Sequence, residues 1–313
     1  MSKTFKVRNI LRSSIPLLVM WIQVISIFAQ SSVDCEALNQ LSPSSPEYIV
    51  AKAACELQES VWEADYLKGE QISEQTQAVI SNCTDSVLIA RYLLIEAELF
   101  KIRQDLHRAT LNYEEAIRIF DRAELINESA DAKISLAEFY RSTEQYDLAI
   151  LQLRYIVKLD SGLAQFSPRV MARAWHRLAA IAYEYEKNPD RAIDYSMKSL
   201  SYSTASGLLE HQDISYNELG AAYYALKDID SALKNLEKAL SIWRKLGRPH
   251  YEANSLLAIV RIKGDLDPEE GLKLYDDLLF ICTKHHIPSI SYLALQGKGR
   301  LLFQLGEYDQ AMS

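Results

Sequence analysis

Three side chains that bind transition metals lie close together near the end of the sequence: Cys282, His285 and His286. A zinc-protease helix needs two histidines four residues apart beside a glutamate, and a structural zinc site needs paired cysteines. The six histidines and four cysteines of the chain have neither spacing. We therefore interpret the two histidines as the end of a helix before Pro288 and Cys282 as a small buried residue, and we expect no metal or other cofactor.

A second group of residues looks like a calcium loop. Asp265, Asp267 and Glu269 alternate as oxygen ligands do in such loops, but Glu270 stands where the EF-hand turn needs glycine. The dipeptide Asp267-Pro268 is instead typical of a helix start, in which aspartate caps the helix and proline occupies its first turn. We expect Asp267 and Glu270 to form a capping box there.

The stretch Gly297-Lys298-Gly299-Arg300 has the glycines and basic side chains of a phosphate-binding loop. A P-loop, however, is a turn between a strand and a helix, and it ends in Gly-Lys followed by Ser or Thr. These glycines lie within a helical pattern, so we interpret them as close-packing positions. Since the sequence also lacks a nucleophile elbow and a dinucleotide fingerprint, we predict that the protein is not an enzyme.

The elements that carry these side chains are expected to be helices. Apolar residues recur with a 3.6-residue period from Pro46 onward, and the alternating runs typical of strands do not occur. In the stretch LGAAYYALKDIDSALKNLEKAL, residues 219–240, small residues stand where a core helix normally has bulky ones. This pattern recurs along the chain, and it predicts close helix–helix packing at Ala137, Ala149, Ala179, Ala192, Gly220, Ala232, Ala239, Gly299 and Ala311.

The residues expected to open the second helix of each pair define the period of this pattern. They are Ala116, Ala149, Ala192, Ala232, Gly271 and Ala311, with successive spacings of 33, 43, 40, 39 and 40 residues. In the first of these copies, Tyr113-Glu114-Glu115-Ala116 is expected to begin the second helix. A near-constant period of this length indicates a helical repeat.

The order of small and aromatic residues resembles the tetratricopeptide repeat, whose signature is an aromatic residue, Leu-Gly, Tyr, a turn, then Ala and Ala-Leu. The resemblance extends over residues 86–313, with Leu257 and Lys298 as departures from the pattern. It implies an all-α fold, a tetratricopeptide-like α-solenoid of antiparallel helix pairs in a right-handed superhelix. The family unit is about 34 residues, so the longer repeats here are expected to extend their second helices, which Gly207 and Gly247 then end.

In such a solenoid the first helix of each pair lines an inner groove, and the resemblance implies that the groove binds a protein or peptide. Arginine and tyrosine at its matched positions are the residue types that dominate binding interfaces. The predicted groove residues are Glu138, Arg141, Arg173, His176, Tyr183, Asn217, Tyr224, Tyr251, Asn254, Arg261, Arg300 and Phe303. The Lys and Asn pair with which some members of the family hold a C-terminal carboxylate is absent, which disfavours a receptor for chaperone tails.

The N-terminal region differs from the repeats. Residues 1–30 combine a basic start, a short apolar run and a small-residue exit, which predicts a signal peptide or, as the alternative, an N-terminal anchor. Residues 31–85 are expected to form a helical cap, with one helix after the prolines at 43 and 46 and another near residue 70. In an oxidising compartment, either Cys35 and Cys55 or Cys55 and Cys83 are expected to form a disulfide.

Charge and organisation together narrow the function. Removal of residues 1–30 takes away four positive charges, which lowers the net charge from −8 to −12 and disfavours nucleic acid as a partner. We expect a secreted or periplasmic interaction module that binds a protein or peptide and contacts a membrane only through an uncleaved N-terminal segment or a span after Ser313. The last repeat is expected to be truncated, and the alternatives are the sensory half of a bacterial membrane signalling protein, with a kinase or DNA-binding output, and a self-assembly module.

Overall fold

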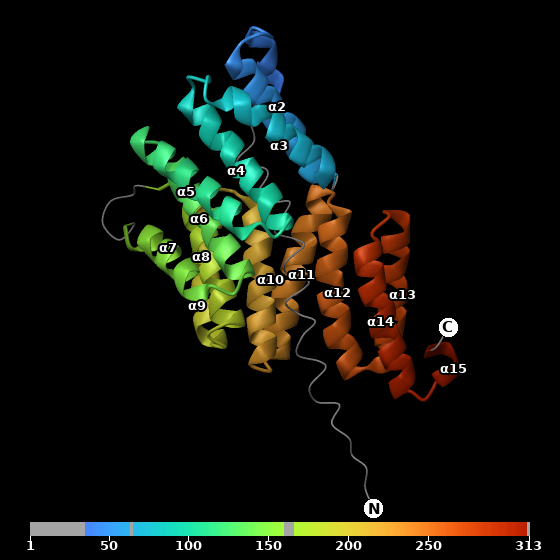
Figure 1. The fold of residues 1–313 in the computed structure, drawn as a ribbon. Coiled ribbons are helices and arrows are strands. Elements are labelled where there is room, and N and C mark those ends of the chain that lie inside the picture. Colours follow the sequence, from blue (N-terminus) through green and yellow to red (C-terminus); the bar gives the residue numbers. More distant parts are fainter. Residues whose placement is uncertain (1–34, 63–64, 160–165, 312–313) are drawn as a thin grey trace, which may run out of the picture. The chain divides into compact units, whose positions relative to one another are not determined.

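The structure of the protein, a computed structural model, describes residues 35–62, 65–159 and 166–311. Every regular element in these ranges is a helix (Figure 1), which confirms the predicted all-α fold. The elements are η1 (Cys35–Gln40), α2 (Pro46–Trp62), α3 (Tyr66–Ile80), α4 (Ser86–Ile102), α5 (Leu106–Arg122), α6 (Ile126–Ser142), α7 (Tyr146–Leu159), α8 (Pro168–Glu184), α9 (Pro189–Ala205), α10 (Leu209–Ala225), α11 (Ile229–Leu246), α12 (Pro249–Leu266), α13 (Pro268–Lys284), α14 (Pro288–Gln304) and α15 (Tyr308–Ala311).

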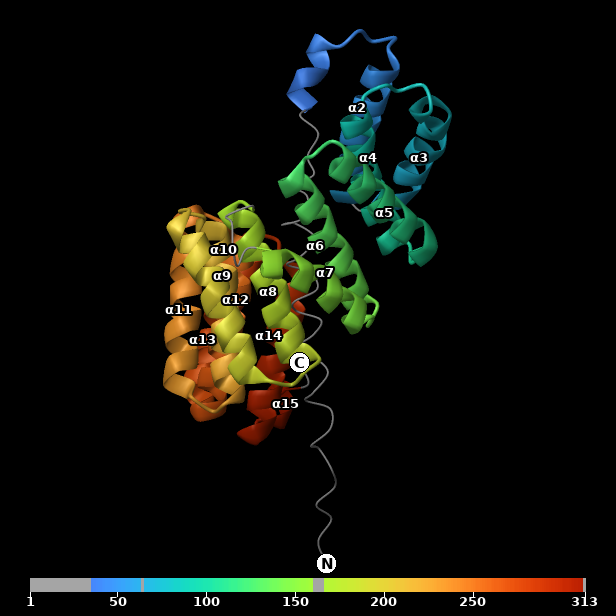
Figure 2. The ribbon, with the colours of Figure 1, turned by 90° about the vertical axis from the view of Figure 1, so that its left-hand side faces the viewer.

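The chain divides into two compact units, residues 1–170 and 171–313. In both units, short turns join successive helices, so helices that are neighbours in sequence also pack together. Figures 1 and 2 show the helices of the second unit running side by side. The helix pairs α4/α5, α6/α7, α8/α9, α10/α11, α12/α13 and α14/α15 follow the predicted order of first and second helices.

Most turns between the helices place one residue in the left-handed conformation. Gly207 and Gly247 have φ values of 68° and 63°, which confirms the predicted ends of the helices before them. Lys227 has a φ of 64° in the turn between α10 and α11, although it carries a side chain. The next helix begins within two residues of each such residue, so the helices that these turns join end and begin close together.

The turn before α13 confirms the helix-start interpretation of Asp267. Its carboxylate accepts hydrogen bonds from the backbone N–H groups of Glu269 and Glu270, at 3.0 and 3.1 Å. The reciprocal half of a capping box is not formed, because the Asp267 N–H donates to the Lys263 carbonyl at 2.8 Å. The Glu270 side chain instead pairs with the Lys263 ammonium group at 3.5 Å.

The first copy of the repeat was assigned to the wrong residues. Helix α5 begins at Leu106, so Tyr113 and Ala116 lie well inside the helix rather than at its start. Ala109, which is fully buried, occupies the opening position. From Ala109 to Ala149 is 40 residues, so the irregular spacing of 33 disappears. The prediction failed because successive turns of one helix offer similar small residues, and sequence alone does not show where the helix begins.

The predicted packing positions are mostly at close contacts. Ala137, Ala149, Ala179, Ala192, Ala232 and Ala239 are at most 2% exposed. A methyl group added to Gly220 would lie 2.6 Å from Leu236 Cγ, so α10 and α11 approach at van der Waals distance there. Gly299 is different, because a methyl group there would lie 3.6 Å from the Ala311 carbonyl oxygen, an ordinary contact. The close approach in α14 is at Gly297, where an added methyl group would lie 2.1 Å from Tyr275 Oη.

The helices of residues 46–80 share a core with the first repeat helix. Val50, Leu57, Ile72, Tyr92 and Ile95 belong to one buried apolar cluster, to which α2, α3 and α4 all contribute. The two helices expected in the cap are therefore present and pack on the array.

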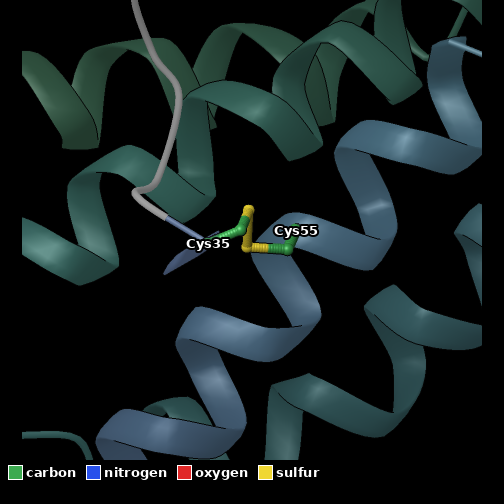
Figure 3. The surroundings of a disulfide bond; sticks show 2 residues. All are labelled: Cys35 and Cys55. Carbon is green, nitrogen blue, oxygen red and sulfur yellow. A yellow bond between two sulfur atoms is a disulfide. The ribbon is translucent and has the colours of Figure 1, made fainter. Parts of the chain in front are cut away.

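A disulfide joins Cys35 to Cys55 in α2 (Figure 3), which selects one of the two predicted pairings. Cys83 and Cys282 are free thiols and are buried, as expected for Cys282. The predicted signal peptide at residues 1–30 lies outside the described residues. Within the ranges that are described, no helix is both long enough and apolar enough to cross a membrane.

Candidate functional site

The predicted groove residues of the second unit lie on the first helices of successive pairs. Arg173, His176 and Tyr183 belong to α8; Asn217 and Tyr224 to α10; Tyr251, Asn254 and Arg261 to α12; and Arg300 and Phe303 to α14. Several of these residues bond to side chains of the next first helix. We call the side of α8, α10, α12 and α14 that carries these bonds the first-helix face.

A short polar contact joins α8 to α10 on this face, and a hydrogen bond joins α10 to α12. His176 Nδ1 lies 2.8 Å from Glu218 Oε1, and both side chains are largely buried. The Asn217 side-chain oxygen accepts a hydrogen bond from Ser255 Oγ at 3.3 Å. Neighbouring residues of α10 therefore reach in opposite directions, one toward the preceding first helix and one toward the following one.

Asp265 joins three first helices at once. Tyr224 Oη of α10 donates a hydrogen bond to Asp265 Oδ2 at 3.2 Å, and Arg300 Nη2 of α14 lies 2.7 Å from Asp265 Oδ1. Burial raises the pKa of Tyr224, and the charge of Asp265 raises it further. At neutral pH the Tyr224 hydroxyl therefore remains a hydrogen-bond donor.

Beside this carboxylate lie two groups whose bonding capacity is unused. Tyr275 of α13 is fully buried, and its O–H group has no hydrogen-bond acceptor among the described residues. Burial raises the pKa of Tyr275, and the nearby charges of Arg261 and Arg300 oppose that effect. Arg261 itself forms no ion pair with any carboxylate in the described part of the chain.

Other predicted groove residues are used in packing or lie elsewhere. Tyr251 stacks on Trp243 of α11, with ring centroids 4.2 Å apart and an interplanar angle of 17°, and burial raises the pKa of Tyr251 to about 12. Arg173 is 5% exposed. Arg141 belongs to the first unit, where it forms a buried ion pair with Glu138 at 2.7 Å. Of the other predicted groove residues, Tyr183 and Asn254 are partly exposed and Phe303 is exposed.

Two polar residues of the face, Asp265 and Glu218, and one residue beside it, Tyr275, were not predicted as groove residues. Asp265 follows Tyr224 by 41 residues, so the repeat spacing points to it, but its place beside Asp267 had suggested a turn. Glu218 follows Asn217 directly, but its contact with His176 depends on how α8 packs on α10, which the sequence of α10 alone does not show. Tyr275 lies on a second helix, and nothing in the sequence signals that its hydroxyl reaches the first-helix face.

The chemistry of the face is that of recognition. Its guanidinium, amide and hydroxyl groups donate hydrogen bonds to carbonyl and carboxylate oxygens, and its two carboxylates accept from N–H groups. Among the described residues, no group of three or more His, Cys, Asp or Glu side chains is placed to hold a metal ion.

Comparisons with known proteins agree with this architecture. The model of the tetratricopeptide repeat matches residues 170–245 and 211–284, which include α8 to α13 of the second unit. No curated protein sequence matches the chain significantly.

Solved structures resemble the fold at low sequence identity. The apo form of the quorum sensor NprR from B. thuringiensis has a TM-score of 0.69 and 12% identity, covering 94% of this chain and 81% of that one. Aspartyl phosphate phosphatase F from Bacillus subtilis has a TM-score of 0.65 and 14% identity, covering 85% and 67%. A Rap protein complexed with Competence and Sporulation Factor has a TM-score of 0.63 and 12% identity, covering 95% and 78%. The matched repeats of this chain are therefore helical repeats of the tetratricopeptide type, and its fold is similar to these helical solenoid structures.

Proposed function

We propose that the protein is a non-catalytic interaction module that binds a protein or peptide partner on the first-helix face. The observation that carries this proposal is the row of polar and aromatic side chains that successive first helices bring together, from His176 through Tyr224 to Arg300. A row repeated every 40 or so residues offers regularly spaced donors and acceptors, which suit the regularly spaced carbonyl and N–H groups of an extended chain.

The similar folds support this proposal. One of the neighbouring structures is a complex of a Rap protein with Competence and Sporulation Factor, and another is a quorum sensor. Those proteins contain helical arrays of the same type, and this chain has a polar first-helix face of its own. We therefore propose a binding role for this chain as well.

The absence of catalysis is part of the proposal, because one neighbour is named a phosphatase. The arrangement around Glu218 supports it. Ser196 Oγ and His176 Nδ1 lie 3.3 and 2.8 Å from the two oxygens of this one carboxylate. A serine hydrolase needs its nucleophile bonded to the histidine, with the carboxylate behind the ring. Here the carboxylate lies between the two groups, so the cluster holds α8, α9 and α10 together.

We also propose that the protein is exported. The basic start and the apolar run of residues 1–30 support a signal peptide. The disulfide between Cys35 and Cys55 supports an oxidising compartment.

The binding role is tested with random 12-residue peptides displayed on phage and selected against the full chain without residues 1–30. We expect enriched sequences whose synthetic peptides bind about tenfold or more weakly to the double variant Asn217→Ala, Tyr224→Ala. Tyr155→Ala, on the second helix α7 of the first unit, is the matched control and should change the affinity less than about twofold. Equal binding of both variants, or no enrichment over an unrelated helical protein, would refute the proposed function.

A further inference from the structure

Two arginines and a buried tyrosine hydroxyl meet at one place on the first-helix face. Arg261 comes from α12, Arg300 from α14 and Tyr275 from α13, the helix between them in sequence. Tyr275 Oη meets α14 at Gly297, which lies one helical turn before Arg300. Arg261 lies one turn before Asp265 on α12, and Asp265 contacts Arg300 at 2.7 Å. The charges of both arginines act on the Tyr275 hydroxyl. Asp265 is the one carboxylate of the cluster, and it binds Arg300 and Tyr224 rather than Arg261.

The charges of this cluster do not balance. Two guanidinium groups face a single carboxylate, although the chain as a whole has a net charge of −8. Arg261 is only partly exposed, so water does not screen its charge as it does on an open surface. A partly buried guanidinium without a carboxylate partner is a place where one more negative charge binds favourably.

The hydroxyl group of Tyr275 is a second and independent observation. Its O–H group is buried and has no hydrogen-bond acceptor among the described residues. The ring reaches this position because residue 297 is glycine, since any Cβ there would lie 2.1 Å from the Tyr275 oxygen. A buried donor without a partner costs stability, so the structure maintains an unused donor next to two cations.

We propose that Arg261 and Arg300 bind a carboxylate group of the peptide partner, with the Tyr275 hydroxyl as a third donor. This inference rests on the proposed function and names the chemistry that the partner must carry. Asp265 holds Arg300 in place until the partner arrives, and the carboxylate of the partner then shares or replaces that contact. The carboxylate comes from an Asp or Glu side chain or from the C-terminus of the peptide.

The same phage selection tests the charge preference. In displayed 12-residue peptides the C-terminus is fused to the coat protein, so any enriched carboxylate is a side chain. We expect Asp and Glu to be enriched on the wild-type chain and to lose that enrichment on Arg261→Met. Synthetic peptides from the selection should bind about tenfold more weakly to Arg261→Met or Arg300→Met. Arg191→Met, on the exposed start of α9, is the matched control.

A second pair of variants separates binding from folding. Asp265→Asn removes the internal competitor for Arg300, so the acidic synthetic peptides should bind more tightly. Tyr275→Phe removes the unpartnered hydroxyl, so it should leave the melting temperature unchanged or raised while it weakens the binding of the same peptides. A hydroxyl with a purely structural role would give the opposite result, with a lower melting temperature and unchanged binding.

The source of the carboxylate is decided with the free synthetic peptides. Replacing their Asp or Glu by Asn or Gln should abolish the tenfold effect of Arg261→Met if a side chain binds. If amidation of the C-terminus abolishes it instead, the terminal carboxylate binds.

Selected peptides without acidic enrichment, bound equally by wild type and Arg261→Met, would overturn this inference and leave the proposed function standing. If no peptide at all is selected, both this inference and the proposed function fail.

Discussion

The carboxyl group of Asp213 is the most unfavourably placed acid of the second unit. It belongs to α10, is 1% exposed, and its Oδ1 atom has no hydrogen-bond partner in the described part of the chain. Burial raises the pKa of Asp213 well above its usual value, while contacts with Ile214 and Trp243 oppose that effect only in part. The folded chain therefore favours the protonated acid.

This raised pKa predicts a stability that depends on pH. In the unfolded chain Asp213 loses its proton near the usual pKa of an aspartate, whereas in the folded chain it keeps the proton to a higher pH. The contribution of Asp213 to stability is therefore complete below the usual value and is lost as the pH rises toward the folded pKa. Asp213→Asn should remove this loss. Between the usual pKa and the folded pKa, the free energy of unfolding of the variant should therefore rise relative to wild type by about 1.4 kcal/mol for each pH unit.

Urea unfolding followed by circular dichroism between pH 4 and pH 8 measures this difference. Thr283→Ala, at an exposed position of α13 that carries no titratable group, is the control and should give a difference that does not change with pH. If Asp213→Asn also gives a constant difference, the carboxyl group is not protonated preferentially in the folded state.

Polar contacts of this kind were the part of the site that sequence did not predict. The register of the repeat placed Asn217, Tyr224 and Arg300 on first helices, because helical periodicity fixes which face a residue occupies. It did not pair Tyr224 with Asp265, because that contact depends on how far one helix pair is rotated against the next. Rotation between pairs is set by packing over many side chains, which no single stretch of sequence displays.

The contact between α10 and α11 depends on the absence of a side chain at Gly220. Because an added methyl group would lie 2.6 Å from Leu236 Cγ, we expect Gly220→Ala to destabilise the fold by about 1–3 kcal/mol. Gly299→Ala is the matched substitution at a position with room, and it should stabilise by up to about 1 kcal/mol through helix propensity. Thermal unfolding of the two variants should therefore shift in opposite directions.

A third variant checks the mechanism of the Gly220 effect. If the clash is with Leu236, the double variant Gly220→Ala, Leu236→Ala should be less destabilised than the sum of its two single variants. Additive losses would mean that Gly220 matters for another reason.

The sequence predicted which helices meet more reliably than where they meet. Counted from the first residue of each helix, Gly220 of α10 matches Val260 of α12, so the sequence register that placed Leu257 there was wrong by about one helical turn. Val260 is bulkier than glycine, and the closest approach of α12 and α13 lies nearer the turn. There Gly264 and Gly271 face each other, and a methyl group added to Gly271 would lie 2.5 Å from the Gly264 Cα atom. A bulky residue at one crossing point thus displaces the contact along both helices, a change that depends on both partners at once.

Within each unit, every helix contacts chiefly its neighbours in sequence. The bond between Cys35 and Cys55 closes a loop of about 20 residues, which in chain-entropy terms contributes about 3 kcal/mol. Since stability in such arrays is largely local, the effect should remain near α2 and α3. We predict that Cys35→Ser, Cys55→Ser increases hydrogen exchange in residues 46–80 and leaves α10 to α13 unchanged.

Hydrogen exchange with mass-spectrometric detection measures both regions in one experiment. Reductant should reproduce the effect in the wild-type chain and have none in the double variant. Equal acceleration in α10 to α13 would contradict local stability and indicate that the whole chain unfolds as one cooperative unit.

The recurring turn has a consequence for how the length of the protein can change. Gly207 and Gly247 are 40 residues apart, both in the left-handed conformation and both at the end of a second helix. A deletion of residues 207–246 would join Ser206 to Gly247. A left-handed glycine would then still follow the end of a second helix. Duplications and deletions of whole 40-residue blocks therefore require no new turn, whereas gains or losses of other sizes would disrupt one.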